Sequence, residues 1–171
     1  GITSLSTDGV NVYGTGFVFG SGGNLEGVFA ASWNTGELVW IADCHGDSYS
    51  TFPMGDAVYK AGHAHHCGNF GGFPETSPRS YNRALAFSKA ATTTVGRNPF
   101  SGYFNYEGRP GPSPLLWYPN MNAGTFTGQF QGPWNVSGDS RYVVFGGEFT
   151  EVNFRGQQGL ARFAVPALAP N

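Results

Sequence analysis

The 171-residue chain is poor in charge and especially in lysine. Asp, Glu, Lys and Arg make up 12% of it, and the nine basic residues, of which two are lysine, are scattered singly. With a formal net charge of −2 the chain has no basic field that could gather phosphates, so nucleic acid is not an expected partner. No apolar run approaches the roughly 18 residues that span a bilayer, and we expect no membrane insertion.

Recognisable catalytic motifs are missing as well. The sequence has no Gly-x-Ser-x-Gly turn, no phosphate-binding loop and no dinucleotide fingerprint. Carboxylates are few, and no spacing among them indicates a pair for glycoside hydrolysis. These absences favour a binding or structural module over an enzyme.

Cysteine occurs only at Cys44 and Cys67, which allows either one disulfide or two free thiols. Little lysine, with abundant Gly, Ser, Thr, Asn and aromatic residues, favours an extracellular protein, where disulfides form and persist. We therefore predict a Cys44–Cys67 disulfide and a secreted or cell-surface location. The chain starts at Gly1 without Met or an apolar leader, so we expect a removed signal peptide or a larger parent protein.

Glycine, proline and aromatic side chains are abundant: the chain has 27 Gly, 11 Pro and 16% aromatic residues. A composition rich in turns and in aromatic packing predicts an all-β protein. A length of 171 residues is enough to bury a core of its own.

One sequence pattern occurs three times: an apolar strand reaches a Gly, and a second apolar strand returns. The three copies align at Val12, Val58 and Tyr142, at Gly16, Gly62 and Gly146, and at Phe29, Leu85 and Ala161. A preceding strand in each copy ends in Asp-Gly or Gly-Asp, which suits a tight turn. Four short antiparallel strands in a unit of about forty residues form the blade of a β-propeller. The alternative is a β-sandwich with a chance similarity.

The copies make residues 1–165 an expected β-propeller segment of three four-stranded blades, near 1–45, 46–123 and 124–165. Residues 166–171 resemble a Pro-rich linker to a following domain. Propellers typically need about four to eight blades, so these blades form an incomplete ring. We expect further blades of the same polypeptide, or an oligomer, to cover the exposed edges and apolar faces.

The third copy, residues 141–164, resembles the delta-sixty type β-propeller repeat, in which Gly-Gly-Asp-Phe-Thr follows an apolar strand and the return strand is Gly-Leu-Ala-Arg-Phe. The matching residues are Gly146, Gly147, Glu148, Phe149 and Thr150, then Gly159, Leu160, Ala161, Arg162 and Phe163. Glu148 replaces the customary Asp, and Phe17 and His63 replace the second Gly in the other copies. The resemblance implies a secreted or surface-attached bacterial protein, often multidomain, with no common catalytic mechanism.

A long insertion in the second copy, between Thr92 and Ala123, is rich in aromatic residues. Long aromatic loops are often functional, and this one is not expected to be disordered. A sugar ring can stack its C–H face on an aromatic plane while its hydroxyls bond to polar side chains. The candidate glycan-binding residues are Tyr103, Tyr106, Trp117 and Tyr118. In the alternative, these side chains cap the core of the blade and touch no ligand.

Three of the four histidines fall within residues 63–66. On a strand, His63 and His65 would point to one face, and a Cys44–Cys67 disulfide would bring His45 near them. Such a cluster could hold zinc or copper, judged by ligand softness, although no spacing matches an established zinc motif. Two alternatives are a His–Asp pair in general acid–base catalysis and a set of polar residues without a ligand.

Together these patterns predict a secreted or cell-surface binding module for a glycan or a neighbouring surface polymer, because a rigid repeat frame presents shaped loops. One rival is a metal-dependent enzyme that uses His45, His63 and His65. The other is a structural segment of a larger propeller assembly whose ligand site lies elsewhere.

Overall fold

The structure, a computed structural model, describes residues 1–18 and 24–169, and this part of the chain is all-β. Its only helices are the short 3-10 turns η1 (Gly68–Phe70) and η2 (Pro166–Leu168). The predicted fold class is therefore confirmed at the level of secondary structure. No helix in the described part is long and apolar enough to cross a membrane.

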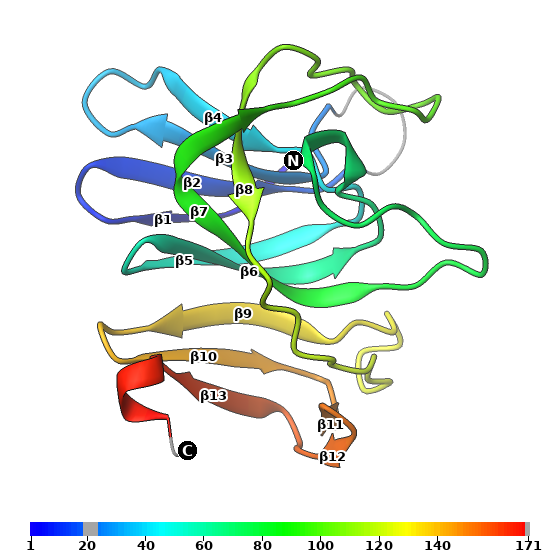
Figure 1. The fold of residues 1–171 in the computed structure, drawn as a ribbon. Coiled ribbons are helices and arrows are strands. Elements are labelled where there is room, and N and C mark those ends of the chain that lie inside the picture. Colours follow the sequence, from blue (N-terminus) through cyan, green and yellow to red (C-terminus); the bar gives the residue numbers. More distant parts are fainter. Residues whose placement is uncertain (19–23, 170–171) are drawn as a thin grey trace.

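Two four-stranded antiparallel sheets come first along the chain (Figure 1). The first sheet contains β1 (Ile2–Thr7), β2 (Asn11–Gly16), β3 (Gly27–Ser32) and β4 (Leu38–Ala42), paired in that order. The second sheet contains β5 (Ser48–Met54), β6 (Ala57–Ala64), β7 (Asn82–Thr94) and β8 (Pro110–Pro114), also paired in order.

The third sheet has three strands in the described residues, one fewer than the expected blade. They are β9 (Pro133–Gly138), β10 (Tyr142–Gly147) and β13 (Leu160–Ala164), with β10 in the middle. A separate hairpin of β11 (Glu151–Val152) and β12 (Arg155–Gly156) lies between β10 and β13 in the chain. Of the predicted linker 166–171, Pro166–Leu168 form η2, and residues 170–171 lie outside the described residues.

The sheets are stacked face to face, with β1, β5 and β9 side by side through the stack (Figure 1). These are the strands that the sequence places ahead of each repeat. The positions aligned by the repeats also fall on equivalent strands, β2, β6 and β10, and on their return strands, β3, β7 and β13. The same order of strands thus recurs in every main sheet.

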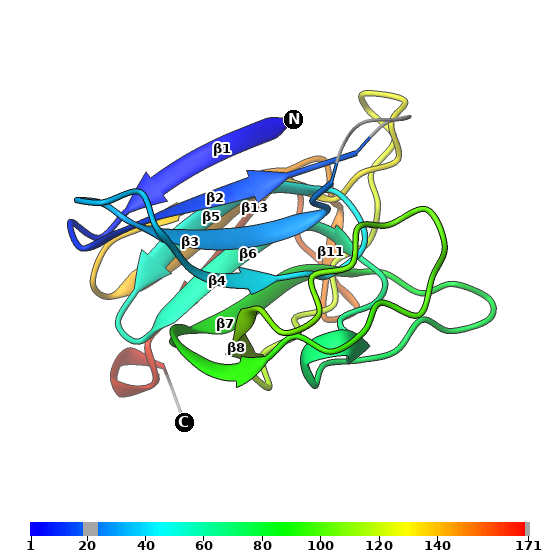
Figure 2. The same cartoon turned by 90° about the horizontal axis from the view of Figure 1, so that it is seen from above.

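The second sheet lies behind the first when seen from above (Figure 2) and between the first and third in Figure 1, and it contributes side chains to two cores. Val58 pairs with Phe87, and both side chains join the core toward the first sheet, where Trp40 is fully buried. Ala61 pairs with Ala84, and both join the core toward the third sheet, where Phe145 is fully buried. Alternation along the strands therefore supplies two separate cores from one sheet.

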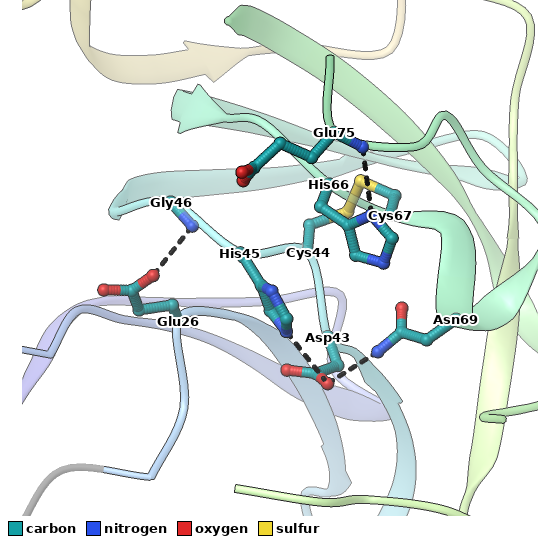
Figure 3. Close-up of a disulfide and its surroundings, with 9 residues drawn as sticks. All are labelled: Glu26, Asp43, Cys44, His45, Gly46, His66, Cys67, Asn69 and Glu75. Carbon is teal, nitrogen blue, oxygen red and sulfur yellow. Dashed lines mark hydrogen bonds and ion pairs between the residues drawn. A yellow bond between two sulfur atoms is a disulfide. The ribbon is translucent and has the colours of Figure 1, made fainter. Parts of the chain in front are cut away.

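The Cys44–Cys67 disulfide is confirmed, and it closes a separation of 23 residues. Cys44 follows β4 of the first sheet, and Cys67 follows β6 of the second. The bond therefore clamps the two sheets together at the end of the stack where their loops meet (Figure 3).

Candidate site at the end of the sheets

A polar pocket of about 340 Å³ opens at this end of the stack. Loops of all three main sheets supply its walls. Its wall includes Glu26, Asp47, His63, His65, Arg79, Tyr81, Tyr103, Gln129 and Gln131. Three of them lie directly before strands, since Glu26 precedes β3, Asp47 precedes β5 and Tyr81 precedes β7.

Both ring nitrogens of His63 are engaged in hydrogen bonds. The backbone N–H of Asp47 donates to Nε2 over 3.3 Å, and Nδ1 lies 2.7 Å from Gln131 Oε1 and 3.2 Å from the Tyr49 hydroxyl. Because Nε2 accepts, the network assigns the proton to Nδ1, which donates to Gln131. Burial lowers the pKa of His63 to about 4, so the imidazole is neutral at pH 7.

Two carboxyl groups face the pocket. Glu26 Oε2 accepts the backbone N–H of Gly46 over 2.8 Å (Figure 3), and Asp47 Oδ2 lies 3.4 Å from the Tyr49 hydroxyl, which donates to it. Burial raises the pKa of both carboxyl groups above their ordinary values, and the charge on Asp47 adds to the rise at Glu26. The pocket therefore offers carboxyl oxygens that can accept hydrogen bonds from a ligand.

Lys60 lies beneath these carboxyl groups and is completely buried. Its Nζ has no hydrogen-bond partner among the described residues. A Cβ on Gly62 would lie 2.9 Å from this nitrogen and would collide with the Asp47 carbonyl oxygen, so glycine is required where the lysine passes. Burial lowers the pKa of Lys60 to about 7, and the charges of Asp47 and Glu26 oppose this shift.

Aromatic rings form part of the pocket wall. The Tyr81 ring meets His63 and His65 edge-on at centroid distances of 5.7 and 6.1 Å, and the side chain is 42% exposed. Tyr103 stacks on His45 with a centroid distance of 3.9 Å and an interplanar angle of 3°. One face of the Tyr103 ring is therefore covered by the His45 ring.

A second polar cluster, Asp43, His45, His66 and Asn69, is buried behind the pocket beside the disulfide (Figure 3). Asn69 Nδ2 donates to Asp43 Oδ2 over 2.7 Å, and His45 Nε2 lies 3.7 Å from the same oxygen. Among the described residues, neither ring nitrogen of His45 has a hydrogen-bond partner. This cluster belongs to the packing between the sheets.

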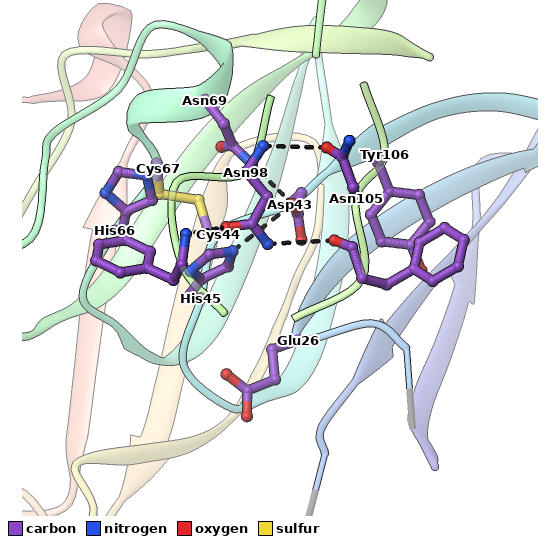
Figure 4. Close-up of polar contacts among 12 residues, drawn as sticks. Glu26, Asp43, Cys44, His45, His66, Cys67, Asn69, Asn98, Asn105 and Tyr106 are labelled. Carbon is purple, nitrogen blue, oxygen red and sulfur yellow. Dashed lines mark hydrogen bonds and ion pairs between the residues drawn. A yellow bond between two sulfur atoms is a disulfide. The ribbon is translucent and has the colours of Figure 1, made fainter. Parts of the chain in front are cut away.

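The loop of residues 98–106 covers this cluster (Figure 4). The Phe100 ring contacts His45 and His66 at centroid distances of 5.6 and 5.0 Å. Asn98 ties the loop to itself, because its backbone N–H donates to Asn105 Oδ1 over 3.0 Å and its side-chain amide donates to the Phe104 carbonyl. The predicted aromatic insertion is therefore ordered, and part of it forms core.

The predicted metal ligands lie near one another but in two groups. His63 and His65 do lie on one side, around Tyr81, but His45 approaches His65 from the buried cluster, at a centroid distance of 6.2 Å. His65 Nδ1 is 2.6 Å from Glu75 Oε2. Within residues 1–18 and 24–169, no three His, Cys, Asp or Glu side chains gather so as to hold a metal ion. The zinc or copper site stays a prediction without support from this geometry.

The four predicted glycan-binding aromatics are not gathered in one place. Tyr103 lines the pocket. Tyr106 is buried in the core between the first and second sheets, and its hydroxyl donates to the Asn24 carbonyl over 2.8 Å. Trp117 packs against the core between the second and third sheets, where its ring contacts Phe145. Tyr118 is 38% exposed and contacts Phe73 outside the pocket.

Sequence reasoning missed Glu26, Tyr81, Arg79 and the two glutamines of the pocket. A signal for the first two was present in the repeats. Glu26 and Tyr81 each stand immediately before the return strand of their copy, and equivalent positions in repeated sheets lie at the same end. Arg79, Gln129 and Gln131 carry no such signal, because their loops differ between copies.

Comparison of the chain with protein-family models, with curated proteins and with solved structures finds no match.

Proposed function

We propose that the protein is a secreted or cell-surface binding module that recognises a glycan in the pocket at the end of its sheets. The observation that carries this proposal is the composition of the wall, where Glu26, Asp47, Gln131 and two tyrosines converge from separate sheets. Carboxylates and amides accept and donate hydrogen bonds to sugar hydroxyls, while tyrosine rings offer flat surfaces to the C–H faces of a sugar. The disulfide supports the extracellular location.

A second candidate is a hydrolase that acts on the same ligand. Two carboxyl groups with raised pKa values, Glu26 and Asp47, share one pocket, and such groups suit general acid–base catalysis. As the enzymatic alternative we prefer this hydrolase to the metal-dependent enzyme, because general acid–base catalysis by two carboxyl groups needs no metal ligands. A bound glycan that is recovered intact excludes it.

We further propose that the sheets are consecutive blades of a β-propeller, in keeping with the delta-sixty resemblance. Support comes from the recurring strand order and from the face-to-face stacking with β1, β5 and β9 side by side. The outer face of the first sheet is apolar, with Leu5 63% exposed across from Phe29 and with Leu38 also exposed. In this arrangement a further blade, from the same polypeptide or another copy, covers that face.

The binding proposal is tested on a glycan array with the wild-type protein and the variants Tyr81→Ala and Tyr103→Ala. We expect each variant to bind roughly 5- to 150-fold more weakly, which corresponds to about 1–3 kcal/mol for a lost stacking side chain, by analogy with bases on aromatics. Asp47→Asn should also weaken binding, since the amide replaces an acceptor by a donor.

Tyr118→Ala is the matched control, because Tyr118 is 38% exposed against 42% for Tyr81 but contacts Phe73 outside the pocket. It should bind as the wild type does. Thermal unfolding of each variant shows whether it is folded. The proposal fails if no glycan is retained, or if folded Tyr81→Ala and Tyr103→Ala bind like the wild type. A loss confined to Tyr118→Ala would instead move the site to the insertion loop.

A further inference from the structure

The pocket does not end at the third sheet. A second pocket of about 320 Å³ shares Tyr81 and Gln131 with it and adds Arg83 and Phe130. Because the two pockets have residues of their walls in common, they adjoin. The cavity therefore continues past Tyr81 over the loop that leads into β9.

On the opposite side a third pocket, of about 170 Å³, shares Glu26 and Tyr103 with the central one. It adds Asn24 and Phe104 to the wall. Because each outer pocket shares wall residues with the central one, the three pockets adjoin as one groove between the loops of the first sheet and those of the third. A groove of this form fits a polymeric ligand that lies along it.

Each compartment of the groove has its own aromatic platform. Phe104 stands at one end, Tyr81 in the middle and Phe130 at the other end, and all three side chains are exposed. Polar side chains accompany them, with Asn24, Glu26 and Gln131 along the same wall. Repeated aromatic surfaces with polar groups between them suit a ligand built of repeated, hydroxyl-rich units.

Phe130 is held in place by its loop. Glu148 accepts hydrogen bonds from the backbone N–H groups of Thr127 and Gln131, at 2.8 and 3.0 Å, and from the Thr127 hydroxyl. Within this loop Phe130 has a φ of 57°, in the left-handed region that bulky residues rarely adopt, and 65% of it is exposed. A fixed loop that presents a large apolar ring to solvent in a strained conformation indicates a role in binding.

The charges that line the groove favour an uncharged ligand. Arg79 and Arg83 share the walls of the groove with Glu26 and Asp47, and Arg79 pairs with Glu75 at 3.1 Å, so no stripe of one sign runs along the groove. A polyanion such as nucleic acid would need a basic track along its backbone. The groove has none in the described residues.

We infer that the groove binds a linear, uncharged glycan internally, with consecutive sugar units over Phe104, Tyr81 and Phe130, and not a terminal monosaccharide. This inference rests on the proposed function and specifies that the glycan is linear, uncharged and bound along its length. Each platform contributes separately, so affinity rises with chain length until the three compartments are filled and then levels off. Removing a terminal platform shortens the length over which affinity rises.

The test uses isothermal titration of the wild-type protein with ladders of one to six units of β-1,4-linked glucose, α-1,4-linked glucose and β-1,4-linked N-acetylglucosamine. For the ladder that binds, we expect at least tenfold tighter binding of three units than of one, and little gain beyond the filled groove. Phe130→Ala and Phe104→Ala should each bind the long members about tenfold more weakly and leave the shortest binding member unchanged.

Phe126→Ala is the matched control for Phe130→Ala. Phe126 lies in the same loop and is 95% exposed, but it lines a different pocket, together with Phe149 and Thr150. It should leave the whole ladder unchanged. Because all three phenylalanines are exposed, their variants should unfold at nearly the wild-type temperature.

The outcomes separate this inference from the proposed function. Equal affinity for one unit and for six, with binding still lost in Tyr81→Ala, overturns the extended groove and leaves a monosaccharide site. Equal losses in Phe126→Ala and Phe130→Ala also overturn it. If no member of any ladder binds and the array is empty, the proposed function falls and the inference with it.

Discussion

The two faces of the second sheet are buried in different ways. Toward the first sheet, the core contains Trp40, the Cys44–Cys67 disulfide and buried Lys60, whose ammonium has no hydrogen-bond partner in the described residues. Toward the third sheet, buried Ser50 both donates to and accepts from the backbone of Val136, at 3.3 and 3.2 Å, whereas Arg83 Nε has no hydrogen-bond partner in the described residues. No disulfide crosses that second core in the described part of the chain.

This difference shows that two interfaces of one fold can be stabilised in different ways. An unpaired buried polar group costs free energy, whereas Ser50 is satisfied in both directions. At the first interface Lys60 is unpaired, and the disulfide there offsets its cost by restricting the unfolded chain. The second interface is stabilised by ordinary apolar packing around Phe145.

The largest expected effect comes from emptying either core. Trp40→Ala and Phe145→Ala should each lower the free energy of unfolding by about 3–5 kcal/mol, because both side chains are fully buried. Trp40→Ala should cost more, since the Trp40 indole N–H donates to the Lys89 carbonyl over 2.7 Å. Urea denaturation measures both values. A loss below about 1 kcal/mol in either variant would contradict the burial described here.

Removing the disulfide should have the next largest effect, and only the first interface holds it. Cys44→Ala combined with Cys67→Ala should lower the free energy of unfolding by about 3 kcal/mol on the chain-entropy model for a separation of 23 residues. Reductant should destabilise the wild type to the same extent and leave the double variant unchanged. Alkylation of both cysteines in the native protein without reductant, seen by intact mass, would show that the bond is absent.

The smallest loss of stability at pH 7, and the sharpest test of the contrast, is expected for Lys60→Met. A buried amine is replaced by an apolar chain of similar length, so stability at pH 7 should be unchanged or higher. The pKa of Lys60 is about 7 in the folded protein and 10.5 in the unfolded chain. Between these values the unfolded chain binds more protons, and the stability of the wild type should therefore rise with pH.

From pH 7 to 9.5 this contribution amounts to at most about 3 kcal/mol, and Lys60→Met should lack it. Thermal unfolding at both pH values provides the measurement. Lys89→Met, which changes the chain's other lysine at a partly exposed ion pair with Asp8, is the control and should keep the rise. Identical pH profiles for the wild type and Lys60→Met would mean that Lys60 is not buried as described.

Much of the fold could be predicted from local patterns. The turn residues after Thr7, Met54 and Gly138 mark the ends of β1, β5 and β9, and alternation marks the strands that follow. The sequence predicts a loop where β8 lies, since Pro110, Pro112 and Pro114 interrupt any strand pattern. Proline is tolerated there because β8 is the edge strand of its sheet.

The candidate site was predictable only in part. Composition and spacing indicated Tyr103, His63 and His65, which lie in the pocket wall, but also Tyr106 and Trp117, which pack in the cores. Burial of an aromatic side chain in a loop has no periodicity that the sequence could show. Glu26, Tyr81 and Gln131 are far apart in the chain, so nothing local indicates that they meet.

The sequence by itself determined the all-β class, the recurrent strand order and the disulfide partners, because strand alternation, turn chemistry and a single pair of cysteines are local or compositional properties. The tertiary structure alone decided which aromatics face solvent, which imidazole nitrogens are free and which loops form the groove. These depend on how the sheets stack, and Glu26 reaches Gly46 and His63 reaches Gln131 only after that stacking. Contacts between distant segments arise from packing of whole faces, which a one-dimensional pattern does not contain.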